Sequence, residues 1–170
     1  MGFEGGAAVA AGLIGGAAMG VLLYIGIAMM PRQMKMNLFL MLGTMMARGG
    51  TVAYAGGGAT YRGKTVTYAT GAMIHAGMSV VFGLIHAGFI TAFGLETSLA
   101  AWGVLFGFVH WIVVGMGLGM MRLMHPLIRS GDMEAPGAFA LGYPPMTAVG
   151  FFMLHILFGV VVGALYTVFA

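Results

Sequence analysis

Residues 146–170 read MTAVGFFMLHILFGVVVGALYTVFA, a stretch without Lys, Arg, Asp or Glu. A helix that crosses a bilayer needs about 20 mostly apolar residues. Three further stretches meet this requirement and carry no charge in their interiors: residues 5–30, 68–93 and 98–121. The sequence therefore predicts an all-α integral membrane protein, with four transmembrane helices in an up-down-up-down bundle and one membrane domain over residues 1–170.

The composition agrees with a lipid environment. Hydrophobic residues make up 61% of the 170-residue chain and charged residues only 6%, against roughly 45–50% and 25% in an ordinary soluble domain. The mean hydropathy is +1.01. Seven basic and four acidic residues cannot cover the surface of a soluble protein of this size, which excludes a water-soluble enzyme, a disordered chain and a nucleic-acid binding protein. Cysteine is absent, which excludes disulfides, thiolate metal sites and iron–sulfur clusters.

The basic residues predict the orientation. Lys and Arg occur only between the first and second spans and between the third and fourth: Arg32, Lys35, Arg48, Arg62 and Lys64, then Arg122 and Arg129. Short loops rich in Lys and Arg face the cytoplasm. We therefore expect a multi-pass protein of the cytoplasmic (inner) membrane with both termini outside.

The two basic loops differ in pattern. Residues 34–47 are mostly apolar and too few for a span, so we expect a short interfacial or re-entrant helix there. Residues 49–63 are rich in Gly and Thr and predict a loop. In the second basic loop we expect the prolines to break any helix. These are Pro126, Pro136, Pro144 and Pro145.

Small residues recur at every fourth position in three of the spans. They are Ala8, Gly12, Gly16 and Gly20; Gly103 with Gly107 and Gly115 with Gly119; and Gly159 with Gly163. Such spacing marks close helix contacts in membranes. It predicts packing within the bundle, or dimerisation through the first span.

Four of the five histidines fall inside predicted spans, where an ionisable residue is a functional-site hypothesis by default. At 1.5 Å per residue, His75, His155 and His110 lie roughly 10, 14 and 17 Å from the cytoplasmic end. These three therefore share a band about 7 Å deep. His86, on the same face of the second span as His75, lies roughly 27 Å deep, near the outer surface.

Several roles fit these histidines. Each ring could bond to a neighbouring helix and specify packing. His75, His110, His155 and His86 could bind a transition metal, with Met sulfur as a further ligand, since imidazole suits Zn, Cu, Fe and Ni and thioether favours Cu(I). Paired histidines could ligate haem, or a chain of them could relay protons. No carboxylate lies in the spans, so no catalytic set is predicted.

Three other features bear on the same site. Trp111 is expected to pack on the histidines or against a bound ring, or else to fill the core or face lipid. Eleven of the 18 methionines gather at the cytoplasmic ends of the first and third spans, where they serve either as flexible packing residues or in metal handling. His125 is expected to be an interface residue.

Short motifs in the chain resemble a known family. They are Leu42-Gly43-Thr44-Met45-Met46, His75 followed by Gly83, His110-Trp111, and His155 with Phe158-Gly159 and Gly163-Ala164-Leu165-Tyr166. Over residues 7–166 the chain resembles an uncharacterised family of small four-helix membrane proteins of bacteria and archaea, loosely like the YagU inner-membrane proteins. The resemblance implies that His75, His110 and His155 match the family's recurring histidines, whereas His86 and residues 49–63 depart from its pattern. It implies a fold and a site, but no activity.

The sequence thus predicts a small non-enzymatic membrane protein. It would be an accessory subunit of a larger membrane complex, or a binding protein with a histidine-lined site inside the membrane. A metal- or haem-binding protein and a bundle that conducts protons or small solutes are the alternatives. The expected partners are the lipid bilayer and either further copies of the chain or a larger membrane complex, and not nucleic acid.

Overall fold

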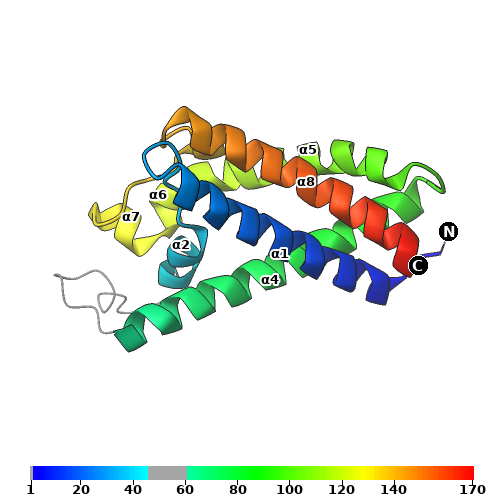
Figure 1. Ribbon diagram of the computed structural model, residues 1–170, viewed down its shortest axis with the longest axis horizontal. Coiled ribbons are helices and arrows are strands. Elements are labelled where there is room, and N and C mark those ends of the chain that lie inside the picture. Colours follow the sequence, from blue (N-terminus) through cyan, green and yellow to red (C-terminus); the bar gives the residue numbers. More distant parts are fainter. Residues whose placement is uncertain (1, 46–60) are drawn as a thin grey trace.

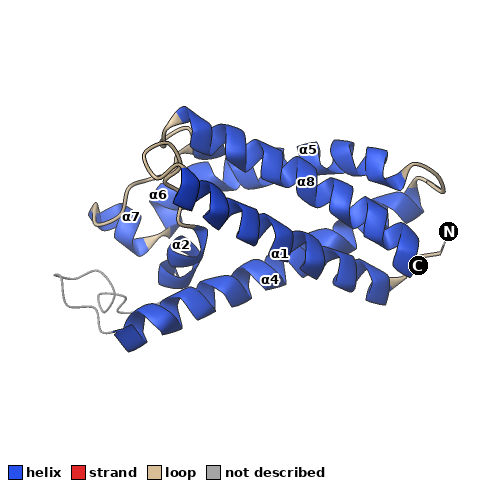
Figure 2. Ribbon diagram, in the orientation of Figure 1, coloured by secondary structure: helices blue, strands red, loops and turns tan. Residues whose placement is uncertain are grey.

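Four long helices build the molecule. The computed structural model describes residues 2–45 and 61–170. In that part, α1 (Gly5–Met29), α4 (Tyr61–Ala92), α5 (Leu99–Gly119) and α8 (Pro145–Phe169) are each long and apolar enough to cross a membrane (Figure 1). Figure 2 shows only helices and loops in the described residues. The predicted all-α four-span architecture is confirmed.

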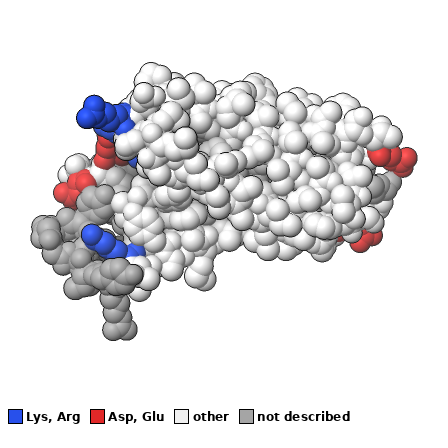
Figure 3. Space-filling model, in the orientation of Figure 1, with Lys and Arg blue, Asp and Glu red and all other residues white. Residues whose placement is uncertain are grey.

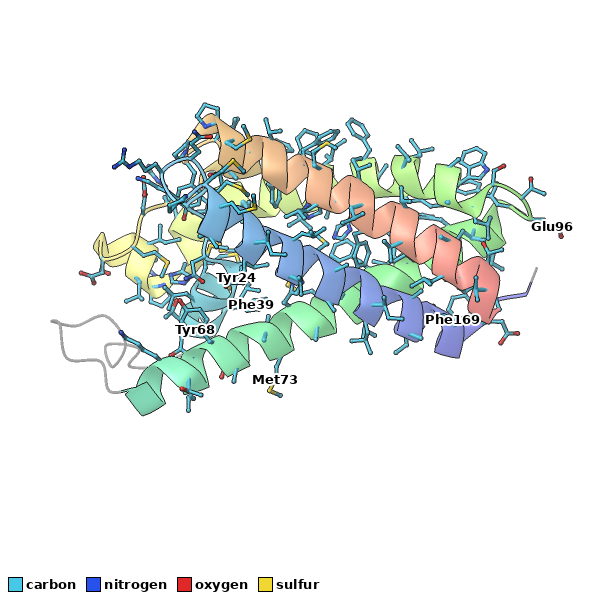
Figure 4. The ribbon with its side chains drawn as sticks, in the orientation of Figure 1. Tyr24, Phe39, Tyr68, Met73, Glu96 and Phe169 are labelled. Carbon is cyan, nitrogen blue, oxygen red and sulfur yellow. The ribbon has the colours of Figure 1, made fainter. Side chains whose placement is uncertain are left out.

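The described Lys and Arg residues gather at one end of the bundle, whereas Asp and Glu lie at both ends, as Figure 3 shows. One end, here called the basic end, carries Arg32, Lys35, Lys64, Arg122 and Arg129. The opposite end, here called the terminal end, carries the N- and C-termini together with Glu4 and Glu96. Between them the outer surface is apolar; Met73, for example, is 75% exposed and points away from the bundle (Figure 4). An exposed apolar belt of this kind suits contact with lipid.

The second long helix begins earlier than its apolar pattern predicts. It starts at Tyr61 rather than at residue 68, so the prediction of a loop as far as residue 63 was wrong at its end; residues 49–60, like Arg48, lie outside the described residues. The added turns are polar and basic, which hides them from a search for apolar spans. They are helical here because they extend α4 along a packing partner, α2 (Leu38–Met45).

The expectation that prolines exclude helices from the second basic loop was also wrong. That loop contains α6 (Met121–Met124), α7 (Pro126–Ser130) and the 3-10 turn η1 (Ala138–Ala140). Pro126 and Pro145 are the first residues of α7 and α8. At that position the missing N–H breaks no helical hydrogen bond, and the fixed φ suits the helix.

Consecutive long helices run in opposite directions, but they do not all pack closely. α1 lies between α4 and α8, and α8 packs along α5. By contrast, α4 and α5 meet at the turn near the terminal end and diverge toward the basic end (Figure 1). The divergence leaves space inside the basic half of the bundle.

Glycines bring the packed helices together. A Cβ added to Gly12 of α1 would lie 2.5 Å from the carbonyl oxygen of Ser79 in α4, and one added to Gly83 would lie 2.6 Å from that of Ala8. Gly103 of α5 and Gly159 of α8 face each other in the same way. The glycine faces are therefore occupied within the chain, which confirms internal packing and overturns dimerisation through the glycines of the first span.

The short helix expected in the first basic loop is present as α2, and it packs inward between α4 and α7. The Tyr24 hydroxyl donates to Asn37 Oδ1 (2.8 Å), and Asn37 Nδ2 donates to the Tyr68 hydroxyl (2.6 Å). Figure 4 shows Tyr24 of α1 and Tyr68 of α4 gathered around Phe39 of α2. The predicted segment covered residues 34–47, but the helix begins only at Leu38; residues 46 and 47 lie outside the described part. α2 thus closes the basic end of the space between the long helices.

Candidate functional site

A cavity of about 90 Å³ occupies the basic half of the bundle. This is well above the roughly 10–15 Å³ that a single water molecule needs. His75 of α4, His110 of α5 and His155 of α8 all line it. The structure therefore brings together the three histidines that the depth estimate grouped, one from each of three helices.

His155 and His110 form the closest pair of imidazoles. Their ring centroids are 4.8 Å apart, with the planes nearly perpendicular at 78°. His155 Nδ1 donates to the carbonyl oxygen of Phe151 at 2.6 Å. In a neutral imidazole only one nitrogen carries hydrogen, so His155 keeps a lone pair on Nε2.

His75 is oriented by a backbone contact with the first helix. Its Nε2 lies 3.0 Å from the carbonyl oxygen of Gly16 and donates to it. The absence of a side chain at Gly16 allows this approach, since a Cβ there would collide with Ser79. The neutral His75 ring therefore keeps its lone pair on Nδ1.

His110 and His86 carry ring nitrogens that no hydrogen bond accounts for. The His110 ring stacks on Phe82, with centroids 3.6 Å apart and planes at 20°. Within the described part of the chain, His110 Nδ1 and both nitrogens of His86 are buried without a hydrogen-bond partner. Buried polar groups are usually paired, so these atoms call for an explanation.

His86 lies outside the cavity but nearer to His110 than the depth estimate predicted. It is 2% exposed, and its ring centroid is 5.7 Å from that of His110 and 5.4 Å from that of Phe158. Helical side chains lean toward the N-terminus of their own helix. Because α4 and α5 are antiparallel, His86 and His110 lean toward each other, which a depth counted along each backbone omits.

Trp111 is not among the residues that line the cavity. Its ring lies against Phe139, Phe152 and Phe108, at centroid distances of 4.7, 5.1 and 5.6 Å. The residue next to His110 thus points into a separate aromatic cluster, and the structure does not place it with the three cavity histidines.

Methionines supply much of the remaining wall of the cavity. The five that line it are Met19, Met36, Met41, Met78 and Met121. Met36, Met41 and Met121 belong to the Met-rich regions seen in the sequence. Met19 and Met78 were missed there, although each lies three residues beyond a site residue on the same helix face, Gly16 and His75 respectively. Other methionines of the same regions, such as Met29 and Met116, are exposed instead.

The donor set of the cavity limits what it can bind. Among residues 2–45 and 61–170, no three side chains of His, Cys, Asp or Glu form a group that could hold a metal ion. None of the described residues that line the cavity is Asp or Glu. A volume of about 90 Å³ is also small beside the roughly 300–1,000 Å³ of pockets for drug-sized ligands.

His125 has a structural role that its sequence context only partly indicated. It is fully buried, with Nε2 3.0 Å from the carbonyl oxygen of Met41 and 3.1 Å from Thr44 Oγ1. Its Nδ1 accepts a hydrogen bond from the backbone N–H of Ile128 (3.4 Å). The residue predicted to lie at an interface therefore joins α2 to the start of α7 inside the protein.

A second, shallower hollow of about 770 Å³ lies between α1 and α4. Its lining is mostly small and apolar, and His75 borders it as well as the central cavity. His75 thus lies between the central cavity and this hollow, which is called the outer groove below.

Searches against protein families, curated proteins and solved structures return no match to this chain. The resemblance to the YagU proteins therefore stays a prediction.

Proposed function

We propose that the protein is a non-enzymatic membrane protein that binds a small ligand in its central cavity, within the bilayer. The observation that carries the proposal is that His75, His110 and His155, from three helices, all line one cavity. Polar groups inside a membrane protein are costly and tend to mark sites of function. The protein would act alone or as an accessory subunit of a larger membrane complex in the inner membrane, with its basic end in the cytoplasm.

A transport path is less well supported than a closed binding site. Toward the terminal end, the bundle is filled by a tightly packed apolar cluster that includes Ala8, Ala87, Ile90 and Tyr166, each no more than 1% exposed. A proton or solute that reached the histidines from the basic end would meet this barrier. The arrangement therefore favours binding over conduction.

The cavity itself can be tested with two neighbouring valines. Val114 lines the cavity, whereas Val113 is 50% exposed on the outer surface. We expect native mass spectrometry of the protein, purified without chelator, to show a bound species. Val114→Phe should remove that species by filling the cavity, and Val113→Phe should keep it.

Two results would contradict this function. One is a wild-type spectrum that contains only the mass of the chain. The other is a bound species that Val114→Phe retains as well as Val113→Phe does.

A further inference from the structure

The cavity combines two kinds of metal donor, and none of its described lining residues carries a negative charge. Its imidazoles come from His75, His110 and His155, and its thioethers from the five methionines named above. Thioether sulfur is a soft ligand that selects Cu(I), and imidazole also binds copper.

Hydrogen bonds fix the orientation of two of the imidazoles and leave one nitrogen of each ring free to bind a metal ion. Histidines that bind metals commonly donate their other ring N–H to a backbone carbonyl, which fixes the tautomer and the ring orientation. His155 does so to Phe151 and His75 to Gly16. Both rings therefore have a lone pair left on the other nitrogen, and the unpartnered Nδ1 of His110 is explained if that ring also belongs to a ligand site.

The spacing of the closest pair suits a shared ion. Imidazole nitrogens bind metal ions at about 2.0–2.1 Å. The centroids of His110 and His155 are 4.8 Å apart, close enough for one ion to reach a nitrogen of each ring. A third ligand would then be a cavity methionine, such as Met41, which is buried.

The charge of an ion determines how strongly the cavity favours it. The cost of burying an ion grows with the square of its charge, and an uncompensated charge in an apolar interior is strongly unfavourable. No carboxylate among the described lining residues offsets that cost. A monovalent soft ion is therefore preferred to Zn²⁺ or Fe²⁺.

We propose that the central cavity binds one Cu(I) ion through His155, His110 and the thioethers of the methionines that line it. This inference rests on the proposed function, since it names the ligand of the same cavity. His75 completes the wall toward the outer groove between α1 and α4.

The test is anaerobic titration of the purified apoprotein with Cu(I) in competition with a coloured Cu(I) chelator. We expect one ion per chain, and no binding of Zn²⁺ under the same conditions. His110→Phe should weaken Cu(I) binding by at least about 10-fold. The matched variant His86→Phe, which changes the adjacent ring outside the cavity, should leave it unchanged. Equal Cu(I) affinity in wild type and His110→Phe would overturn the proposal.

A measurement on the wild type removes any dependence on the folding of the variants. X-ray absorption of the Cu(I)-loaded protein should show both nitrogen and sulfur neighbours of copper. Nitrogen or oxygen neighbours alone, or no copper bound above a protein-free detergent control, would refute the site.

The binding function of the cavity and the Cu(I) assignment can be refuted independently. If a different species occupies the cavity and is displaced by Val114→Phe, but Cu(I) does not bind, the binding function stands and the Cu(I) assignment is wrong. If neither that species nor Cu(I) binds, both are wrong.

Discussion

Two buried histidines show that hydrogen bonding determines whether a buried polar side chain stabilises the fold. His125 and His86 are 0% and 2% exposed. The ring of His125 is bonded at both nitrogens and joins α2 to α7. The ring of His86 is bonded at neither within the described residues and is surrounded by aromatic rings. His125 therefore stabilises the fold, whereas the buried and unpaired ring of His86 lowers its stability.

The same substitution at these two positions should have opposite effects. His86→Leu removes an unpaired buried polar group and should stabilise the protein by about 1–3 kcal/mol. His125→Leu leaves the N–H of Ile128 without its acceptor and should destabilise it by a similar or larger amount. Thermal unfolding in a mild detergent measures both. A lower midpoint for His86→Leu would show that its ring has a partner or a role that the structure does not display.

At the scale of the helix, close backbone contact explains the recurrence of glycine. α1 and α4 touch where Gly12 and Gly83 meet, and α5 and α8 touch where Gly103 and Gly159 meet. Without a hydrophobic drive between helices in lipid, such contacts gain stability through van der Waals packing. They also leave α4 and α5 apart, because α5 is committed to α8 and α4 to α1.

Two glycines of α4 separate packing from helix propensity. A methyl group at Gly83 would lie 2.6 Å from the carbonyl oxygen of Ala8, whereas nothing lies within 4 Å of one at Gly77. Gly83→Ala should therefore cost about 1–3 kcal/mol, and Gly77→Ala should be neutral or stabilise by up to about 1 kcal/mol. Unfolding midpoints of the two variants decide this. Equal midpoints would mean that the α1–α4 contact is looser than described.

Over the whole molecule, the distribution of charge argues for one orientation in the membrane. The described basic residues lie at the end opposite the termini (Figure 3), and basic loops remain in the cytoplasm. The chain has no cysteine, so a single introduced thiol reports on its own location.

Two exposed acidic positions at opposite ends serve for this measurement. We expect Glu96→Cys, in the turn between α4 and α5, to react with a membrane-impermeant maleimide on intact cells. Asp132→Cys, near α7, should react only after the membrane is permeabilised. The reverse pattern would mean that the termini face the cytoplasm.

The sequence by itself determined the four spans, since uninterrupted apolar length is a local property and needs no knowledge of neighbours. It also indicated a short helix after the first span and a shared depth for His75, His110 and His155. It missed the polar start of α4 and the short helices of the second basic loop, such as α7 at Pro126, because packing and helix-end geometry decide those.

Only the tertiary structure decided which side chains meet. Whether a histidine faces a cavity, a carbonyl or a neighbouring ring depends on how the helices are paired and on the direction in which their side chains lean. Those relations placed Trp111 outside the cavity, brought His86 beside His110, and put α2 between α4 and α7. The physical reason is that glycine contacts between segments far apart in the chain determine which helices lie side by side. A local sequence pattern does not contain that information.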